Sequence, residues 1–143
     1  MRAVALHADV IVATSAVLQV NCVIVRGPVE GAGEAFVIDS PVLPDELETL
    51  PTLLDQARFP KPSGLLATHG DWDHLLGRLA FPGVALGCAE STAERLRASP
   101  GEAQRDLREF DRDLLIERPR PLALGSVQAL PVPGRCGIGD HEL

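Results

Sequence analysis

The sequence predicts a single α/β domain over residues 1–143, in which a mixed β-sheet is flanked by helices. The first forty residues are rich in Val, Ile and Phe and are divided by turn-forming residues, which is typical of consecutive strands. After residue 40, short apolar runs alternate with segments of helical periodicity, which indicates α/β layering. The 143 residues suffice for one domain with a substantial core and are too few for two of ordinary size.

The N-terminal strands are expected where β-branched and aromatic residues concentrate: Val4–His7, Val10–Ala13, Val17–Arg26 and Glu34–Asp39. Turn-forming residues separate these segments, at Ala8-Asp9, Thr14-Ser15 and Gly27–Gly33. The third segment is mostly apolar from end to end, as expected of a strand that is covered on both faces.

A helix is expected from Asp45, because Leu47, Leu50 and Leu54 recur at helical spacing. An acidic residue in the first turn also interacts favourably with the positive end of the helix dipole. Pro51 lies inside this run and cannot donate a backbone hydrogen bond, so we expect either a kink or two short helices.

The rest of the chain continues the alternation of strands and helices. Further strands are expected at Ser63–Ala67, Val84–Cys88 and Ser126–Val132, and helices at Leu75–Leu79, Ala89–Arg97 and Glu102–Leu115. The last helix is amphipathic, and its core-facing residues are expected to be Leu107, Phe110, Leu114 and Leu115. Turns are expected at Pro133-Gly134 and Gly137–Asp140, and a further strand begins at His141–Leu143.

Composition and charge exclude several classes of partner. The chain has 13 Lys and Arg against 20 Asp and Glu, a formal net charge of −7, and therefore repels the phosphate backbone of nucleic acids. No apolar run approaches the roughly 18 residues that a membrane-spanning helix needs, and no signal peptide is evident, so we expect no membrane partner and a cytoplasmic location. Three cysteines without CxxC spacing, Cys22, Cys88 and Cys136, are expected to be reduced thiols.

The clearest functional signal is the segment Thr68–His74. Four metal-ligating residue types, His69, Asp71, Asp73 and His74, follow directly after an expected strand, where α/β proteins place their sites. Imidazole nitrogen and carboxylate oxygen suit zinc, iron or manganese. Each residue alone has a structural explanation, such as Asp73 capping a helix or Asp71 forming a turn. Four of them within six residues favour a metal site.

This segment resembles the metal-binding signature of the metallo-β-lactamase-fold hydrolases, His-x-His-x-Asp-His after a strand. Val20–Val25 is similar to an early strand of that family that carries an Asn, and Phe36–Ser40 is similar to the strand that ends in Ile-Asp before the first helix. The resemblance covers essentially the whole chain in order, as the N-terminal part of the fold. It implies an αββα sandwich, in which two sheets pack face to face with helices outside.

The resemblance also implies roles for the four residues. His69 would bind a first metal ion, and Asp73 and His74 would bind a second, with one or two zinc ions expected and iron or manganese as alternatives. Asp73 would in addition be the catalytic residue, because it would orient the attacking water. Asp71 stands where the family has its second His, and it would either bind metal as a harder ligand or hold a ligand in place. The implied activity is hydrolysis of an ester, thioester or related bond in a small-molecule substrate.

The remaining ligands of the family would lie C-terminal to this cluster, beginning with a Pro-Gly-His loop. Here Pro133-Gly134 is followed by Arg135, which cannot bind a metal. Either Arg135 has replaced the ligand, or the loop of the family lies beyond Leu143. The second explanation is favoured, because Gly139–Leu143 resembles the hairpin strand that leads into that loop.

The domain is therefore expected to be truncated at its C-terminus, and pairing of two copies through an open sheet edge into a homodimer would compensate for the missing strands. The competing hypothesis is a catalytically inactive fragment or binding protein of the same fold. Its support is the Asp71 substitution and the lack of recognisable downstream ligands.

Overall fold

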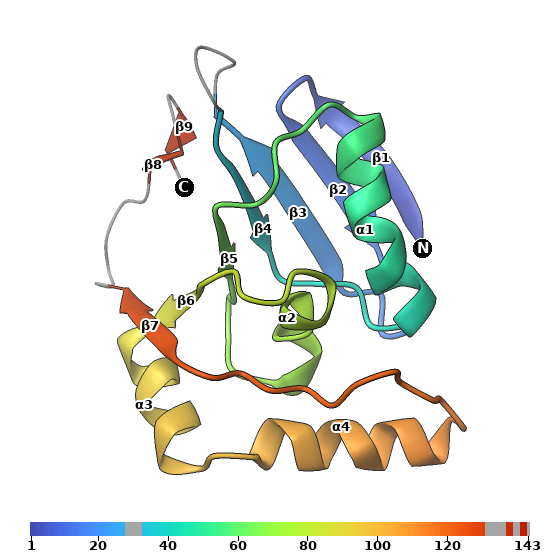
Figure 1. Ribbon diagram of the computed structural model, residues 1–143, viewed down its shortest axis with the longest axis vertical. Helices are drawn as coiled ribbons and strands as arrows, with labels where there is room; N and C mark the ends of the chain where they lie inside the picture. Colours follow the sequence, from blue (N-terminus) through green and yellow to red (C-terminus); the bar gives the residue numbers. More distant parts are fainter. Residues whose placement is uncertain (28–32, 131–136, 139–140, 143) are drawn as a thin grey trace.

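A seven-stranded mixed sheet forms the centre of the computed structural model, which describes residues 1–27, 33–130, 137–138 and 141–142 (Figure 1). The strands are β1 (Arg2–His7), β2 (Val10–Thr14), β3 (Asn21–Arg26), β4 (Ala35–Ile38), β5 (Gly64–Leu66), β6 (Leu86–Ala89) and β7 (Val127–Leu130). Their order in the sheet is their order in the chain. Neighbours from β1 to β4 pair antiparallel and those from β4 to β7 pair parallel. A separate antiparallel pair joins β8 (Gly137–Ile138) to β9 (His141–Glu142).

The parallel strands are connected through helices: α1 (Pro44–Gln56), η1 (Trp72–His74), α2 (Gly77–Ala80), α3 (Glu90–Ala98) and α4 (Glu102–Asp113). Each crossover advances by one strand in the same direction, so connections of the usual right-handed kind place their helices on one face of the sheet. Figure 1 shows α1 and α2 over that face. The prediction of a mixed sheet flanked by helices is therefore confirmed.

The core is built on one row of residues that runs across five strands. Ile11 pairs with Ile24, Ile24 with Val37, Val37 with Leu65 and Leu65 with Leu86, and each is at most 4% exposed. Because alternate residues of a strand share a face, this register places all five side chains against the apolar side of the helices. Burying each such side chain stabilises the fold by about 1.5–3 kcal/mol.

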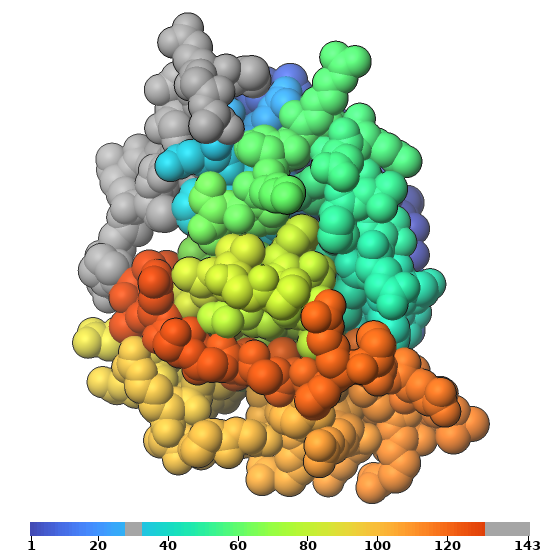
Figure 2. Space-filling view, in the orientation of Figure 1, coloured from blue at the N-terminus to red at the C-terminus, as the bar shows by residue number. Residues whose placement is uncertain are grey.

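The chain returns from α4 to β7 as an extended segment, 114–126, which crosses the lower part of the molecule (Figure 2). Leu122 is buried there, and its N–H donates to the side-chain oxygen of Gln104 on α4. Arg118 forms a two-pronged ion pair with Asp111 and also donates to the carbonyl of Val42, at 2.9 Å. These contacts fix the segment between the helices and the start of α1.

The third strand is shorter than predicted. Residues Val17–Val20 form a turn, in which Leu18 and Gln19 have positive φ values of 56° and 52°, and β3 begins only at Asn21. The chain has to reverse direction between β2 and β3, and the apolar residues at this point gave no sign of a turn. The hairpin is closed by a hydrogen bond from the N–H of Ser15 to the carbonyl of Val20, at 3.0 Å.

The helix that contains Pro51 is continuous, which corrects the expectation of a kink or two helices. Pro51 lies on the exposed side of α1, and its missing N–H leaves the carbonyl of Leu47 without its usual helical donor. The buried residues Leu47, Leu50 and Leu54 pack on the sheet from the turns on both sides of it. The free energy gained from this packing offsets the loss of the backbone hydrogen bond that the proline cannot make.

The end of the fourth helix also differs from prediction. Leu107 is buried and Phe110 is half-buried, as expected, but Leu114 and Leu115 are 51% and 91% exposed. The helix ends at Asp113, and Leu115 adopts a left-handed conformation (φ 55°), so the helical periodicity no longer directs these side chains to the core.

Other predictions concern the cysteines and the C-terminal residues. Cys22 and Cys88 are free and buried, as predicted, and burial raises the pKa of both thiols. Gly137–Ile138 forms a strand rather than part of a turn, whereas the strand expected at His141 is present. The predictions on residues 131–136, which include Arg135 and Cys136, lie outside the described residues. Within the described ranges, no helix has the length and apolarity needed to cross a membrane.

Candidate metal centre

The four predicted ligands lie in the loop that follows β5 and in the short helix η1. The imidazole rings of His69 and His74 are stacked at a tilt of 44°, with their centroids 3.7 Å apart. Oδ2 of Asp71 lies 3.6 Å from Nε2 of His69, and Oδ2 of Asp73 lies 3.4 Å from Nε2 of His74. The structure therefore brings all four side chains together in two imidazole–carboxylate pairs.

Asp39, at the end of β4, supports this loop from below. Its Oδ1 accepts a hydrogen bond from the N–H of Thr68 at 2.9 Å, and its Oδ2 accepts one from the Thr68 hydroxyl at 2.8 Å. The same Oδ2 lies 3.1 Å from Nδ1 of His74. Because β4 and β5 are parallel neighbours, their carboxyl ends meet at one edge of the sheet. The spacing of the predicted ligands did not identify Asp39, which the parallel pairing of β4 with β5 places beside the loop.

The two imidazoles are oriented in the same way by these contacts. The Thr68 hydroxyl, which donates to Asp39, also lies 3.0 Å from Nδ1 of His69. Nδ1 of His74 lies against the Asp39 carboxylate. Both rings therefore turn Nδ1 toward Thr68 and Asp39, and Nε2 toward Asp71 and Asp73.

Asp71 is held by a residue of α3. Its Oδ1 accepts a hydrogen bond from Nη2 of Arg95, on α3, at 3.0 Å, and both side chains are more than half exposed. This hydrogen bond, opposed by slight burial and aided by the positive charge of Arg95, holds the pKa of Asp71 below its usual range. Asp71 is therefore an ionised carboxylate that lies between His69 and Arg95.

Asp73 and its neighbour Trp72 are fixed by the short helix. Asp73 lies inside η1 and its carbonyl accepts a bond from the Ser40 hydroxyl at 3.4 Å, so it does not act as the helix cap that the structural alternative suggested. The ring of Trp72 packs against Phe110 of α4, with centroids 4.6 Å apart. A cavity of about 250 Å³ adjoins this face of the loop, between Asp71, Trp72 and Arg95.

The donor set fits a divalent metal ion in the chemistry of its side chains and not in their arrangement. Histidines that bind a metal usually donate their other ring N–H to a carboxylate or another acceptor, and here Nδ1 of each ring lies beside such a group, the Thr68 hydroxyl or the Asp39 carboxylate. Across the residues that the structure describes, however, no three His, Cys, Asp or Glu side chains are disposed to hold one ion. The carboxylates of Asp71 and Asp73 contact the Nε2 atoms themselves, so the four groups do not converge on a common centre.

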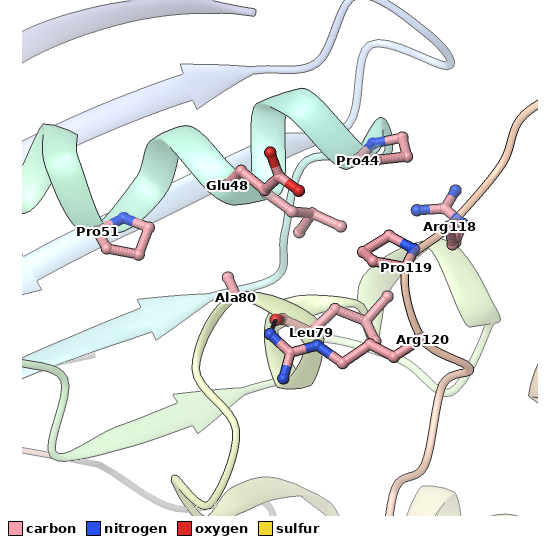
Figure 3. A pocket seen from close by; sticks show the side chains of 9 residues that line it. Pro44, Glu48, Pro51, Leu79, Ala80, Arg118, Pro119 and Arg120 are labelled. Atoms are coloured by element: carbon pink, nitrogen blue, oxygen red, sulfur yellow. Dashed lines mark hydrogen bonds between the residues drawn. The ribbon is translucent and has the colours of Figure 1, made fainter.

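A second cavity, of about 210 Å³, lies between α1, α2 and the segment 118–120 (Figure 3). Leu47, Leu79 and Ala80 form its apolar part, and Glu48 and Arg120 border it from opposite sides. Arg120 donates to the carbonyl of Leu79 at 3.1 Å. No residue of the loop 68–74 lines this cavity, so it is separate from the candidate metal centre.

The comparison with known proteins rests on structure alone, because the sequence matches no family model and no curated protein. A β-lactamase domain protein from Burkholderia ambifaria aligns over 98% of this chain and 45% of its own, with 14% identity and a TM-score of 0.64. A metallo-β-lactamase from Pontibacter korlensis aligns over 99% and 57%, with 15% identity and a TM-score of 0.56. The chain has the metallo-β-lactamase fold.

A B3 metallo-β-lactamase aligns similarly, over 92% of this chain and 57% of its own, with 19% identity and a TM-score of 0.56. The chain thus spans about half the length of the metallo-β-lactamase-fold structures that it matches. At these low identities the structural alignments show a shared fold, and they do not show a shared activity, substrate or metal content.

Proposed function

We propose that this protein is a metal-dependent hydrolase whose metal ion is held by the loop 68–74. The observation that carries the proposal is the orientation of the two imidazoles. Nδ1 of His69 lies against the Thr68 hydroxyl and Nδ1 of His74 lies against Asp39, so each ring turns its Nε2 toward the carboxylates of Asp71 and Asp73. A pair of histidines needed only for packing would not require this shared support from one buried aspartate.

On this proposal, the side chains of His69, His74 and Asp73 would turn toward a common centre to hold the ion, which we expect to be zinc, with iron or manganese as alternatives. When bound, such an ion lowers the pKa of a water molecule and polarises the bond to be cleaved in a small-molecule ester, thioester or related substrate. Asp73 would accept a hydrogen bond from the attacking water and so orient it. Asp39 and Thr68 would keep both rings in the tautomer that leaves Nε2 free.

The test is the metal content of the purified chain, measured by elemental mass spectrometry on wild type, His69→Ala, Asp73→Ala and Asp45→Ala. Asp45 is exposed in the first turn of α1 and serves as the matched aspartate control. The proposal predicts about one bound ion in wild type and control, and its loss in the other two variants. Esterase and thioesterase substrates are then assayed with the metal-loaded chain. The proposal is refuted if the wild-type protein contains no bound metal after it has been incubated with zinc, iron and manganese.

A catalytically inactive binding protein of the same fold is the second candidate function. It is favoured by the engagement of Asp71 with Arg95 and by the lack of a converging three-residue set among the described residues. On this alternative, added metal leaves the melting temperature unchanged in wild type and in His69→Ala. A metal-dependent rise that both His69→Ala and Asp73→Ala abolish would exclude it, because only a ligand bound by the native state stabilises that state.

A further inference from the structure

We propose that the cavity between α1, α2 and the segment 118–120 binds a small ω-amino acid, a zwitterion whose ammonium and carboxylate ends are separated by a short apolar chain. The cavity has a volume of about 210 Å³, below the roughly 300–1,000 Å³ of pockets that take drug-sized ligands, so its ligand is small. No residue of the loop 68–74 lines the cavity, so this site is independent of the proposed hydrolase site.

The walls of the cavity are fixed by the fold. The rings of Pro51 on α1 and of Pro119 on the facing segment each hold the backbone angle φ at their position. Arg118 anchors that segment, because its guanidinium bonds both carboxylate oxygens of Asp111, at 2.8 and 3.0 Å, and the carbonyl of Val42 at 2.9 Å. A cavity that is already formed binds its ligand without a large cost in ordering the protein.

The α1 side of the cavity presents hydrogen-bond acceptors. Leu47 and Pro51 both line it, and the carbonyl of Leu47 lacks its usual helical donor because Pro51 has no N–H. Glu48 borders the cavity from the same helix (Figure 3), and its exposed carboxylate has no hydrogen-bond or ion-pair partner among the described residues. A ligand ammonium group carries a positive charge and three donors, so it complements both acceptors.

The opposite side of the cavity presents a cation. Arg120 donates from Nη2 to the carbonyl of Leu79 at 3.1 Å, and its other guanidinium N–H groups have no acceptor within the described part of the chain. A guanidinium binds a carboxylate through two parallel hydrogen bonds. The structure describes both Arg120 and Glu48, and they form no ion pair with each other, so a ligand can bring the opposite charge to each.

The cavity between these two charges is lined by apolar side chains, which decides the class of ligand. Leu47 from α1 and Leu79 and Ala80 from α2 form this apolar part. An α-amino acid carries both charges on one carbon and cannot place them on opposite sides of the cavity. An ω-amino acid separates the charges by methylene groups, which leave water when they pack against the apolar side chains.

The experiment titrates the isotope-labelled whole chain with δ-aminovalerate and follows the chemical shifts of its amide groups. Norvaline is the matched control ligand, because it is an isomer of δ-aminovalerate that carries both charges on one carbon. Valerate and pentylamine each keep only one of the two charged groups. We expect δ-aminovalerate to shift the amides of Leu79 and Ala80 and to bind with a Kd on the order of 0.1–1 mM, as its small size allows. Norvaline should bind at least about threefold more weakly.

Two variants separate the roles of the charged side chains. Glu48→Gln should weaken the binding of δ-aminovalerate and pentylamine by about two- to fivefold and leave that of valerate unchanged. Arg120→Gln should weaken δ-aminovalerate and valerate by a similar factor and leave pentylamine unchanged. Glu94→Gln and Arg108→Gln are the matched controls and should equal wild type, because both residues are exposed on other helices and do not line the cavity. Circular dichroism verifies that each variant is folded.

The inference is overturned if norvaline binds as tightly as δ-aminovalerate, since the two charges then need no separation. It is also overturned if neither Glu48→Gln nor Arg120→Gln weakens binding, or if the amides of Leu79 and Ala80 do not shift at about 10 mM δ-aminovalerate, where a millimolar site is mostly filled. His69→Ala should bind δ-aminovalerate as the wild type does, so failure of the proposed hydrolase site leaves this inference intact.

Discussion

The carboxylate of Asp39 lies 3.1 Å from Nδ1 of His74, although the two residues belong to different strand–helix units of the chain. The parallel pairing of β4 with β5, with Ile38 opposite Leu66, brings the ends of the two strands together. Asp39 itself has a positive φ of 57°, and its N–H donates to the carbonyl of Leu66 at 2.8 Å. The backbone at the strand end is therefore shaped to direct this side chain under the loop.

Asp39→Asn should weaken metal binding by about 10- to 100-fold, which is the usual effect of losing the outer partner of a ligating histidine. It should also lower the free energy of unfolding by about 1–3 kcal/mol, because Thr68 loses a charged acceptor in a partly buried setting. Zinc titration and urea unfolding measure the two effects. Unchanged zinc affinity in Asp39→Asn would mean that Asp39 supports only the fold.

Stability should fall in acid because of Glu46. This side chain is 2% exposed and accepts hydrogen bonds from the hydroxyl of Ser15 at 2.6 Å and from the N–H groups of Ala16 and Leu43 at 2.8 and 3.1 Å. Burial alone would raise its pKa, but these hydrogen bonds together outweigh burial and hold the pKa below the ordinary 4.5. Since the unfolded state binds the proton more readily, the stabilisation is present above about pH 4.5 and is lost as the pH falls through the lower native pKa.

Glu46→Gln should remove this pH dependence and cost about 1.5–3 kcal/mol at neutral pH, because a side-chain amide cannot accept all of these bonds. Urea unfolding between pH 3 and pH 7 is the measurement. Glu48→Gln, an exposed residue on the same helix, is the control and should behave as wild type. If the free energy of unfolding of Glu46→Gln falls as steeply with decreasing pH as that of wild type, other carboxylates cause the acid sensitivity.

Gly64→Ala should destabilise the sheet by about 1–3 kcal/mol, as expected for overpacking. Gly64 pairs with Phe36 across β4 and β5, and an added Cβ would lie 2.7 Å from the edge of the phenyl ring. Gly77→Ala is the matched control, because its Cβ would meet the side chain of Leu65 at an ordinary 3.5 Å. Equal melting temperatures for the two variants would show that Phe36 moves aside without cost.

Phe110→Ala should loosen the candidate metal loop as well as the end of α4. Trp72 is the only tryptophan of the chain, and its ring packs against Phe110, so its fluorescence reports this contact directly. The emission maximum should shift to longer wavelength in Phe110→Ala and remain near that of wild type in Phe110→Leu. An unshifted spectrum in Phe110→Ala would show that other residues of the loop hold Trp72 in place.

The sequence predicted the alternation of strands and helices well, because buried apolar runs such as Gly64–Leu66 and Leu86–Ala89 contrast sharply with the charged helices around them. It failed where composition and conformation disagree. The apolar residues Leu18 and Leu115 have positive φ values, which only the path of the backbone around them explains. Pro51 was misjudged for a similar reason, since the packing of its neighbours on the sheet outweighs its local preference.

The sequence was enough to predict which residues form the candidate site, but it was not enough to predict which atoms of those residues contact one another. The spacing of His69, Asp71, Asp73 and His74 identified the loop, and the structure brings the four side chains together. The pairing of Asp71 with Arg95 depends on how α3 packs against the loop, which no local pattern encodes. Whether these residues bind metal stays a prediction.

The agreement between strand order and chain order has a kinetic consequence. Each of the seven strands docks on the one made just before it, so a growing chain can extend the sheet one strand at a time as it leaves the ribosome. The longest closure joins β6 to β7 across α3, α4 and the segment 114–126, and the entropy lost in closing a loop grows only slowly with the length of the span. We therefore expect β1–β4, which pair antiparallel, to form first and to serve as the template on which the parallel half assembles.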